Sequence, residues 1–247
     1  MNSDLRIPDD IDERPAEHQT AFGELWEVDA EELFGESNAR HPIWLLSALP
    51  GVASMLHAGP VLEAAGRFDH PRLRGPSVWR RIDSAVWLAA PRPAGELLAT
   101  ASVGRCSWSE ALELWRPLAD AVQRAHRTGV VHGWLNPWNV WLDPETRRLT
   151  ALDAGCWIGA ADVDTAWLAP EARCAAGERD PSPATDVYGL ARVLVQLLRP
   201  DQGEADTPNF TGVPAHAIPV LERALADDPA DRPSRVESLL RASVPMD

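Results

Sequence analysis

The stretch HGWLNPWNVWLD, residues 132–143, places three of the protein's eleven tryptophans at positions 134, 138 and 141. Their spacing does not follow one face of a helix, and Pro137 interrupts the run. The stretch therefore predicts a loop that leads into a short strand at residues 139–143. A second strand is predicted at residues 148–153, after a turn that contains Pro144.

The segments on either side of this stretch differ in pattern. Downstream of residue 92, apolar residues recur at helical spacing, and Ser107 and Glu110 form a capping box that opens a helix to about Arg127. Further helices are predicted after Ser182, over residues 218–226 and after Ser234. Upstream, the predicted elements are strands at residues 23–30, 41–49 and 77–90 and one helix at residues 53–68. The fold class predicted is α+β.

Two lobes follow from this division. A small, strand-rich N-terminal lobe is predicted at residues 1–92, and a mainly helical C-terminal lobe at residues 93–247. The stretch Pro91–Glu96 is the predicted hinge, and a crevice is expected between the lobes. Together the lobes form one domain, because 247 residues are ample for a single large core.

Bulk composition excludes several classes of function. The net charge of −14 makes a nucleic-acid backbone a poor partner. No apolar run approaches the roughly 20 residues of a membrane helix, and the acidic N-terminus does not resemble a signal peptide. We therefore predict a cytoplasmic protein. Three widely spaced cysteines and seven histidines form no zinc or disulfide pattern.

Charged residues are distributed unevenly. The first 37 residues contain 12 acidic residues and two arginines, which indicates either a solvated acidic face or an arm that docks a basic partner. All 23 basic residues are arginine, so the chain has no lysine. Any chemistry that requires a lysine is excluded.

The motifs from residue 132 onward resemble those of the protein kinase superfamily, and most of all its bacterial serine/threonine kinase group. The family pattern is H-[RG]-D-L-x-P-x-N followed by D-F-G. It is matched here by residues 132–139 and by Asp153-Ala154-Gly155. Further resemblances are FDHPRLRG at residues 68–75, after the regulatory helix, and three scaffold positions: Glu171 of the A-P-E motif, Asp186 of a buried helix that braces the loop, and Arg232, which pairs with Glu171.

The resemblance implies phosphoryl transfer from ATP, yet the groups that perform it have changed. The family's catalytic aspartate corresponds to Trp134, whose indole has one N–H donor and no acceptor and cannot act as a base. The loop lysine corresponds to Asn136. The lysine of the third strand corresponds to Leu46, or by a shift of register to Ser47.

The remaining parts of the nucleotide site are also incomplete. Of the glycine-rich loop before ELWEV only Gly23 survives. The usual glutamate of the regulatory helix should lie at Val61, and Glu63 is out of phase with it. The metal-binding pair survives in type as Asn139 and Asp153. These two residues either hold Mg²⁺ and a nucleotide or have structural roles in their own turns.

We therefore predict a pseudokinase: a catalytically inactive kinase-like domain that acts as a scaffold or allosteric partner of another protein. The degenerate loop is His132, Trp134 and Asn136, with no catalytic residue, and no cofactor is expected. Trp134, Trp138 and Trp157 either fill the crevice or form an interface. The alternatives are a nucleotide sensor that binds ATP and Mg²⁺ at low affinity through Asn139 and Asp153, and a kinase with residual or unorthodox activity in which Arg67 or Arg105 supplies the missing cation.

Overall fold

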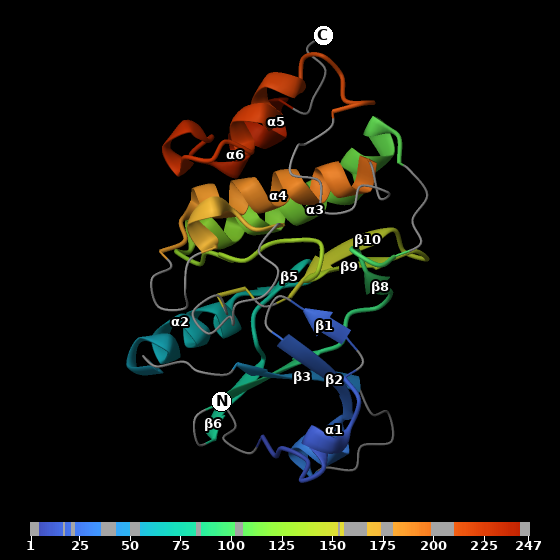
Figure 1. Ribbon diagram of the computed structural model, residues 1–247, viewed down its shortest axis with the longest axis vertical. Coiled ribbons are helices and arrows are strands. Elements are labelled where there is room, and N and C mark those ends of the chain that lie inside the picture. The colour runs from blue at the N-terminus through green and yellow to red at the C-terminus, as the bar shows by residue number, and fades with distance from the viewer. Residues whose placement is uncertain are drawn as a thin grey trace.

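The computed structural model contains ten strands and six α-helices in its described parts. Most strands lie toward one end together with α1, and α3 to α6 lie toward the other (Figure 1). The structure describes residues 5–16, 18–20, 23–35, 43–49, 55–82, 85–101, 106–152, 154–155, 167–173, 180–198 and 210–242. The helices are α1 (Ala30–Phe34), α2 (Met55–Arg67), α3 (Trp108–Arg127), α4 (Pro183–Leu198), α5 (Ile218–Ala224) and α6 (Val236–Ala242).

The strands form two five-stranded sheets. The first has the order β1-β2-β3-β7-β6, from β1 (His18–Thr20), β2 (Gly23–Asp29), β3 (Ile43–Leu49), β6 (Val78–Ile82) and β7 (Ala85–Pro91). The second has the order β4-β5-β10-β9-β8, from β4 (Asp69–His70), β5 (Leu73–Arg74), β8 (Glu96–Leu97), β9 (Val140–Asp143) and β10 (Arg148–Ala151). Within the second sheet β5 and β10 pair in parallel, Leu73 opposite Ala151. Residues 69–74 thus pair with a strand from the C-terminal half of the chain.

Helices α3 and α4 form the centre of the larger half. The capping box at the start of α3 is confirmed: the Ser107 side chain accepts from Glu110 N, and the Glu110 carboxylate accepts from Ser107 N. The two helices pack on one another, and Trp115 donates from Nε1 to Leu190 O at 2.8 Å. Gly189 lets α4 approach the loop at residue 135, because an added Cβ would lie 2.3 Å from Leu135 O. This packing positions residues 132–139 against α4.

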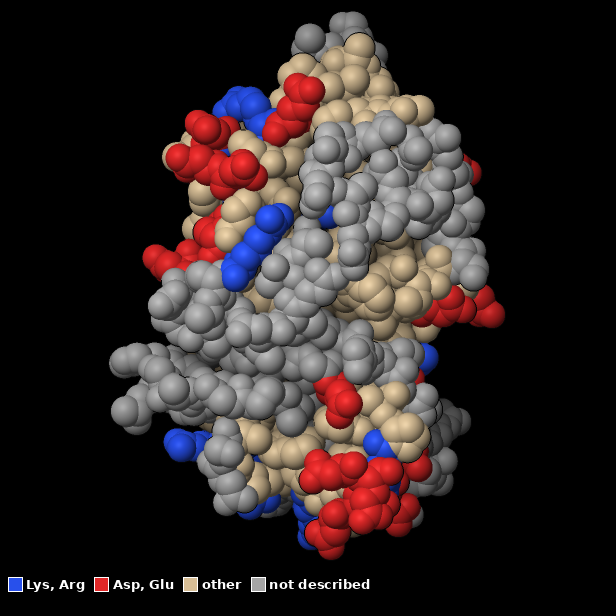
Figure 2. Space-filling model, viewed as in Figure 1, with Lys and Arg blue, Asp and Glu red and all other residues tan. Residues whose placement is uncertain are grey.

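The acidic N-terminal segment contributes to the core of the smaller half. Leu5 and Ile11 are buried in one cluster with Trp26, Val28 and Leu33. The acidic side chains of this region remain exposed and gather at the tip of the smaller half (Figure 2). The apolar residues of the segment therefore anchor it to the smaller half.

Helix α2 continues through Pro60 without ending there. Its apolar face is buried at Leu62 and Ala65. No helix in the described ranges is long and apolar enough to cross a membrane.

Candidate functional site

The loop that carries the kinase-like motif is held from behind by Asp186 in the first turn of α4. One carboxylate oxygen of Asp186 accepts from His132 N at 2.8 Å, and the other accepts from Gly133 N at 2.7 Å. His126 Nε2 lies 2.7 Å from the first of these oxygens. Because Asp186 is fully buried, these donors are what compensate its charge. Asp186, the residue predicted to brace the loop, thus accepts hydrogen bonds from the backbone of the loop.

The ring of His132 is fixed in one neutral tautomer by two backbone groups. Nε2 lies 2.7 Å from Leu152 O, so it carries the proton and donates, and Nδ1 accepts from Trp134 N at 3.3 Å. Burial lowers the pKa of His132, although the nearby Asp186 carboxylate opposes this shift. A proton on Nδ1 would face the Trp134 N–H. His132 therefore acts as a buried spacer between the loop and residue 152.

The two asparagines of the loop bond to the loop's own backbone. Asn136 and Asn139 each donate from Nδ2 to Trp134 O at 2.8 Å. Asn139 Oδ1 accepts from Asn136 N at 3.0 Å, and Asn136 Oδ1 accepts from Trp138 N at 2.8 Å. Both side chains are buried, with 1% exposure. Each side-chain amide thus both donates and accepts a hydrogen bond within the loop. For Asn139 this corresponds to the structural alternative, a role in its own turn.

The side chain of Trp134 lies where elements of both halves of the molecule meet. It is 1% exposed and belongs to a cluster with Leu62 of α2 and with Val86 and Leu88 of β7. The same cluster contains residues from the C-terminal half, namely Leu168, Ala169, Ala172 and Tyr188. The indole therefore links the smaller half to the larger one and offers no surface to a partner in this conformation.

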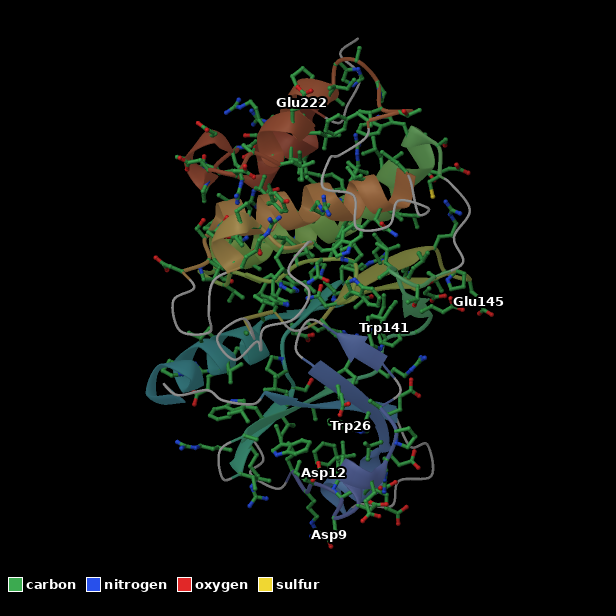
Figure 3. All side chains as sticks on the ribbon, in the orientation of Figure 1. Asp9, Asp12, Trp26, Trp141, Glu145 and Glu222 are labelled. Carbon is green, nitrogen blue, oxygen red and sulfur yellow. The ribbon has the colours of Figure 1, made fainter. Side chains whose placement is uncertain are left out.

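A second tryptophan lies at the junction of the two sheets. Trp141 of β9 is 1% exposed and clusters with Leu25 of β2, Leu97 of β8 and Leu152. Figure 3 shows Trp141 between the strands of the smaller half and β9. The guanidinium carbon of Arg92, in the predicted hinge, lies 4.9 Å from the centre of the indole.

Arg92 also ties the hinge to the first sheet. It forms an ion pair with Glu27 of β2 and donates to Pro93 O at 3.1 Å. One arginine thus covers the Trp141 ring and holds the connection between the lobes.

The register of β3 identifies which position belongs to the inner row of the first sheet. Ser47 pairs with Leu25 and Leu88, residues of the two tryptophan clusters. Leu46 instead pairs with Trp26 and Ala89, which belong to the cluster around Leu5 on the other face. Since cross-strand partners share a face, the register favours Ser47 as the counterpart of the family's lysine. Neither residue is a cation.

The regulatory-helix acid is missing from the inner face of α2. Val61 lines an apolar hollow beside Gly155, and Glu63 is exposed and pairs with Arg67 at 3.4 Å. Gly155 adopts a left-handed φ of 79°, and an added Cβ would lie 2.7 Å from Ala65 Cβ. The glycine of the D-A-G motif is thus required by both backbone conformation and close packing.

Not every residue predicted for the site can be placed in the structure. Asp153, Trp157 and Arg105 lie outside the described residues. Trp138 is half-buried. Among the described residues no group of three or more histidine, cysteine or carboxylate side chains is placed to hold a metal ion.

The scaffold pair predicted at Glu171 and Arg232 is present and bidentate. Arg232 Nη1 and Nη2 donate to the two carboxylate oxygens at 2.7 and 2.8 Å. Arg232 also donates from Nε to Ala226 O at 2.7 Å, and Thr185 Oγ1 donates to Glu171 at 2.8 Å. Burial alone would raise the pKa of Glu171, but these hydrogen bonds outweigh it and lower the pKa. The pair joins the segment at residues 170–172 to the one before α6.

Sequence reasoning missed two features of the site. The place of Trp141 at the sheet junction was not foreseen, because the local sequence only places the residue in a short strand. The cation from the hinge, Arg92, was not singled out either. The hinge lies close to β9 because β8 pairs with β9, with Leu97 opposite Trp141. No local sequence pattern predicts this pairing.

Comparison with known proteins gives a consistent result. No model of a known protein family matches the chain. The sequence is 30% identical over 155 residues, covering 53% of the chain, to the serine/threonine-protein kinase PknK of Mycobacterium tuberculosis and of Mycobacterium bovis. The chain spans only 14% of the length of these relatives.

Solved structures resemble the chain over most of its length. The crystal structure of the Mycobacterium tuberculosis PknI kinase domain has a TM-score of 0.69 and 24% identity, and 92% of each chain is covered. The crystal structure of Rad53 1-466 in complex with AMP-PNP has a TM-score of 0.66 and 18% identity, covering 98% of this chain and 66% of that one. The chain therefore has the two-lobed α+β fold of protein kinases.

Proposed function

We propose that this kinase-like domain transfers no phosphoryl group and acts by binding another protein, as a scaffold or allosteric partner. One observation carries the proposal: the residue at the position of the catalytic base is Trp134, and its ring is buried between the two halves of the molecule. An indole has no acceptor for a hydroxyl proton. Its volume also occupies space that a substrate hydroxyl would need.

The losses affect different parts of phosphoryl transfer. Removal of a general base alone lowers a rate by about 10²–10⁴-fold. The chain also has no lysine to hold the phosphates, and kinases turn over only about 1–100 times per second when complete. The proposal therefore expects transfer below detection.

Nucleotide binding is expected to be absent as well. Trp141 is packed under Arg92 at the junction of the sheets, and the Asn139 amide is committed to the loop backbone. ATP would have to displace a buried indole and open this network. These features support the proposal over the alternative of a nucleotide sensor.

The retained frame supports a role in binding. The Asp186 brace and the Glu171–Arg232 pair compensate buried and half-buried charges, so the domain retains the interactions that stabilise a folded binding surface. A protein partner is proposed over nucleic acid, because the net charge of −14 opposes a phosphate backbone.

The test combines transfer and binding. The purified chain is incubated with radiolabelled ATP, Mg²⁺ and a generic protein substrate, beside a heat-killed sample and the Asp153→Ala variant. We expect all three to give the same signal, and no thermal shift with saturating ATP and Mg²⁺. Transfer that Asp153→Ala abolishes would overturn the proposal, and a nucleotide-dependent thermal shift would establish the sensor instead.

The partner is sought by co-purification from the native host and then tested with purified components. Because the proposal assigns no role to nucleotide, the affinity of the pair should be the same with and without ATP and Mg²⁺. An affinity that requires ATP would contradict it.

A further inference from the structure

A cavity of about 410 Å³ lies in the helical half and is lined by residues from the end of α3, the start of α4 and the start of α6. Its volume falls within the roughly 300–1,000 Å³ of ligand sites. The polar residues that line it are Gln123, His126, Arg127, Ser234, Arg235 and Glu237. It is separate from both tryptophan clusters, because no lining residue belongs to either.

The groups that line this cavity carry net positive charge. In the described part of the chain, Arg127 and Arg235 make no ion pair. The one acid, Glu237, is neutralised by Arg241, with Nη2 and Oε1 2.6 Å apart. Two arginines and a histidine, Arg127, Arg235 and His126, thus line one cavity in a protein whose net charge is −14. Such a concentration runs against the charge of the molecule and indicates a local preference for an anion.

We propose that this cavity binds an oxyanion of the phosphate class. Two guanidinium groups offer paired N–H donors that match the oxygens of phosphate. The Gln123 amide of α3 and the Ser234 hydroxyl before α6 also line the cavity and offer neutral donors. The shared chemistry is a phosphoryl group, either as the free ion or as part of a phosphorylated side chain.

The site is connected to the kinase-like loop through one residue. His126 lines the cavity, its side chain is only 11% exposed, and its Nε2 lies 2.7 Å from Asp186. Asp186 in turn holds the backbone of residues 132 and 133. His126 thus contacts both the cavity and the Asp186 brace. The oxyanion would therefore stabilise the loop from behind, independently of the nucleotide position.

The experiment measures the dissociation constant of inorganic phosphate by calorimetry and its effect on the thermal midpoint, at ionic strength matched with chloride. Matching matters because any salt screens the self-repulsion of an acidic protein. The variants are Arg127→Gln, Arg235→Gln and the double variant. The matched control is Arg124→Gln, an exposed arginine of the same helix that does not line the cavity.

We expect each single variant to weaken phosphate binding at least fivefold and the double variant to abolish it, while Arg124→Gln leaves it unchanged. O-phosphoserine is the second probe: tighter binding than phosphate assigns the site to a phosphorylated side chain, and weaker binding assigns it to the free ion. The proposal is overturned if chloride reproduces the effect, if the double variant still binds, or if Arg124→Gln weakens binding equally.

Discussion

The two sides of the loop at residues 132–139 differ in the kind of contact they make. The side facing α4 keeps the groups of a working kinase fold: Asp186 receives two backbone N–H groups and His126. The side facing the smaller half carries Trp134, which packs against Leu62 and Leu88. One side is polar and satisfied, and the other is apolar and filled.

The difference shows that the frame and the reaction depend on separate interactions. A buried carboxylate with its donors in place contributes to stability whether or not a substrate binds. A catalytic carboxylate that faces open space contributes little to stability, whereas the buried indole of Trp134 removes a large apolar ring from water. The loop is thus stabilised by polar groups on the side of α4 and by apolar packing at Trp134.

The largest test of this contrast is Trp134→Ala. Removing a fully buried tryptophan leaves a cavity between the halves, and we expect the free energy of unfolding to fall by about 3–5 kcal/mol. Chemical denaturation measures this. The control is Trp138→Ala at the half-buried neighbour, where the loss should be clearly smaller. Equal losses at 134 and 138 would show that Trp134 does not join the halves.

The Glu171–Arg232 pair on the frame side gives the next largest effect. Arg232→Gln leaves the half-buried Glu171 carboxylate without its bidentate partner, and we expect a loss of about 3 kcal/mol, the low end of the range for breaking a buried pair. Arg241→Gln is the matched control, because its pair with Glu237 is exposed, with 79% of the arginine side chain accessible, and such pairs contribute about 0–1 kcal/mol. A similar loss in both variants would contradict the assigned role of Arg232 in the frame.

A smaller loss is expected at the brace itself. Asp186→Asn keeps the shape of the side chain but has one carbonyl oxygen for three donors, and we expect a loss of about 2 kcal/mol. Hydrogen exchange at the amides of His132 and Gly133 should accelerate, while exchange in β9 stays slow. Unchanged protection of the two amides would show that the brace does not hold the loop.

Much of this arrangement could be predicted from local patterns. The capping box at Ser107, the loop with its two following strands and the helix after Ser182 each follow from residues close together in the sequence. The scaffold residues Asp186, Glu171 and Arg232 were found through the resemblance, and the structure places the partners where it implied.

The cleft-side residues were harder to predict, since their meaning depends on pairing between distant strands. Leu46 was favoured as the lysine counterpart, but the register of β3 with β2 and β7 favours Ser47, and a one-residue change moves a position to the other face. The role of Trp141 likewise depends on Leu25 and Leu97, which lie far from it in sequence. Trp134 is buried because α2, β7, α4 and residues 168–172 meet around it. The spacing of residues in the sequence does not predict this meeting.

The smallest effect we predict concerns His132, where the two sides of the loop meet. Burial lowers its pKa below the usual 6.5, so below that pH the unfolded chain takes up a proton that the folded chain does not. Stability is therefore fully present above about pH 6.5 and falls as the pH falls, at a rate approaching about 1.4 kcal/mol per pH unit for this one group. Chemical denaturation between pH 8 and pH 5 measures the slope.

The control for this slope is His132→Gln, compared with the unaltered chain at each pH. His70 contributes in the same direction, because burial and the charges of Arg124 and Arg72 also lower its pKa, and its share persists in the variant. The difference between the two slopes thus isolates His132. A variant with the unaltered slope would mean that the ring is protonated in the folded chain, which the Trp134 N–H facing Nδ1 opposes. Such a result would contradict the neutral His132 ring deduced from its two backbone contacts.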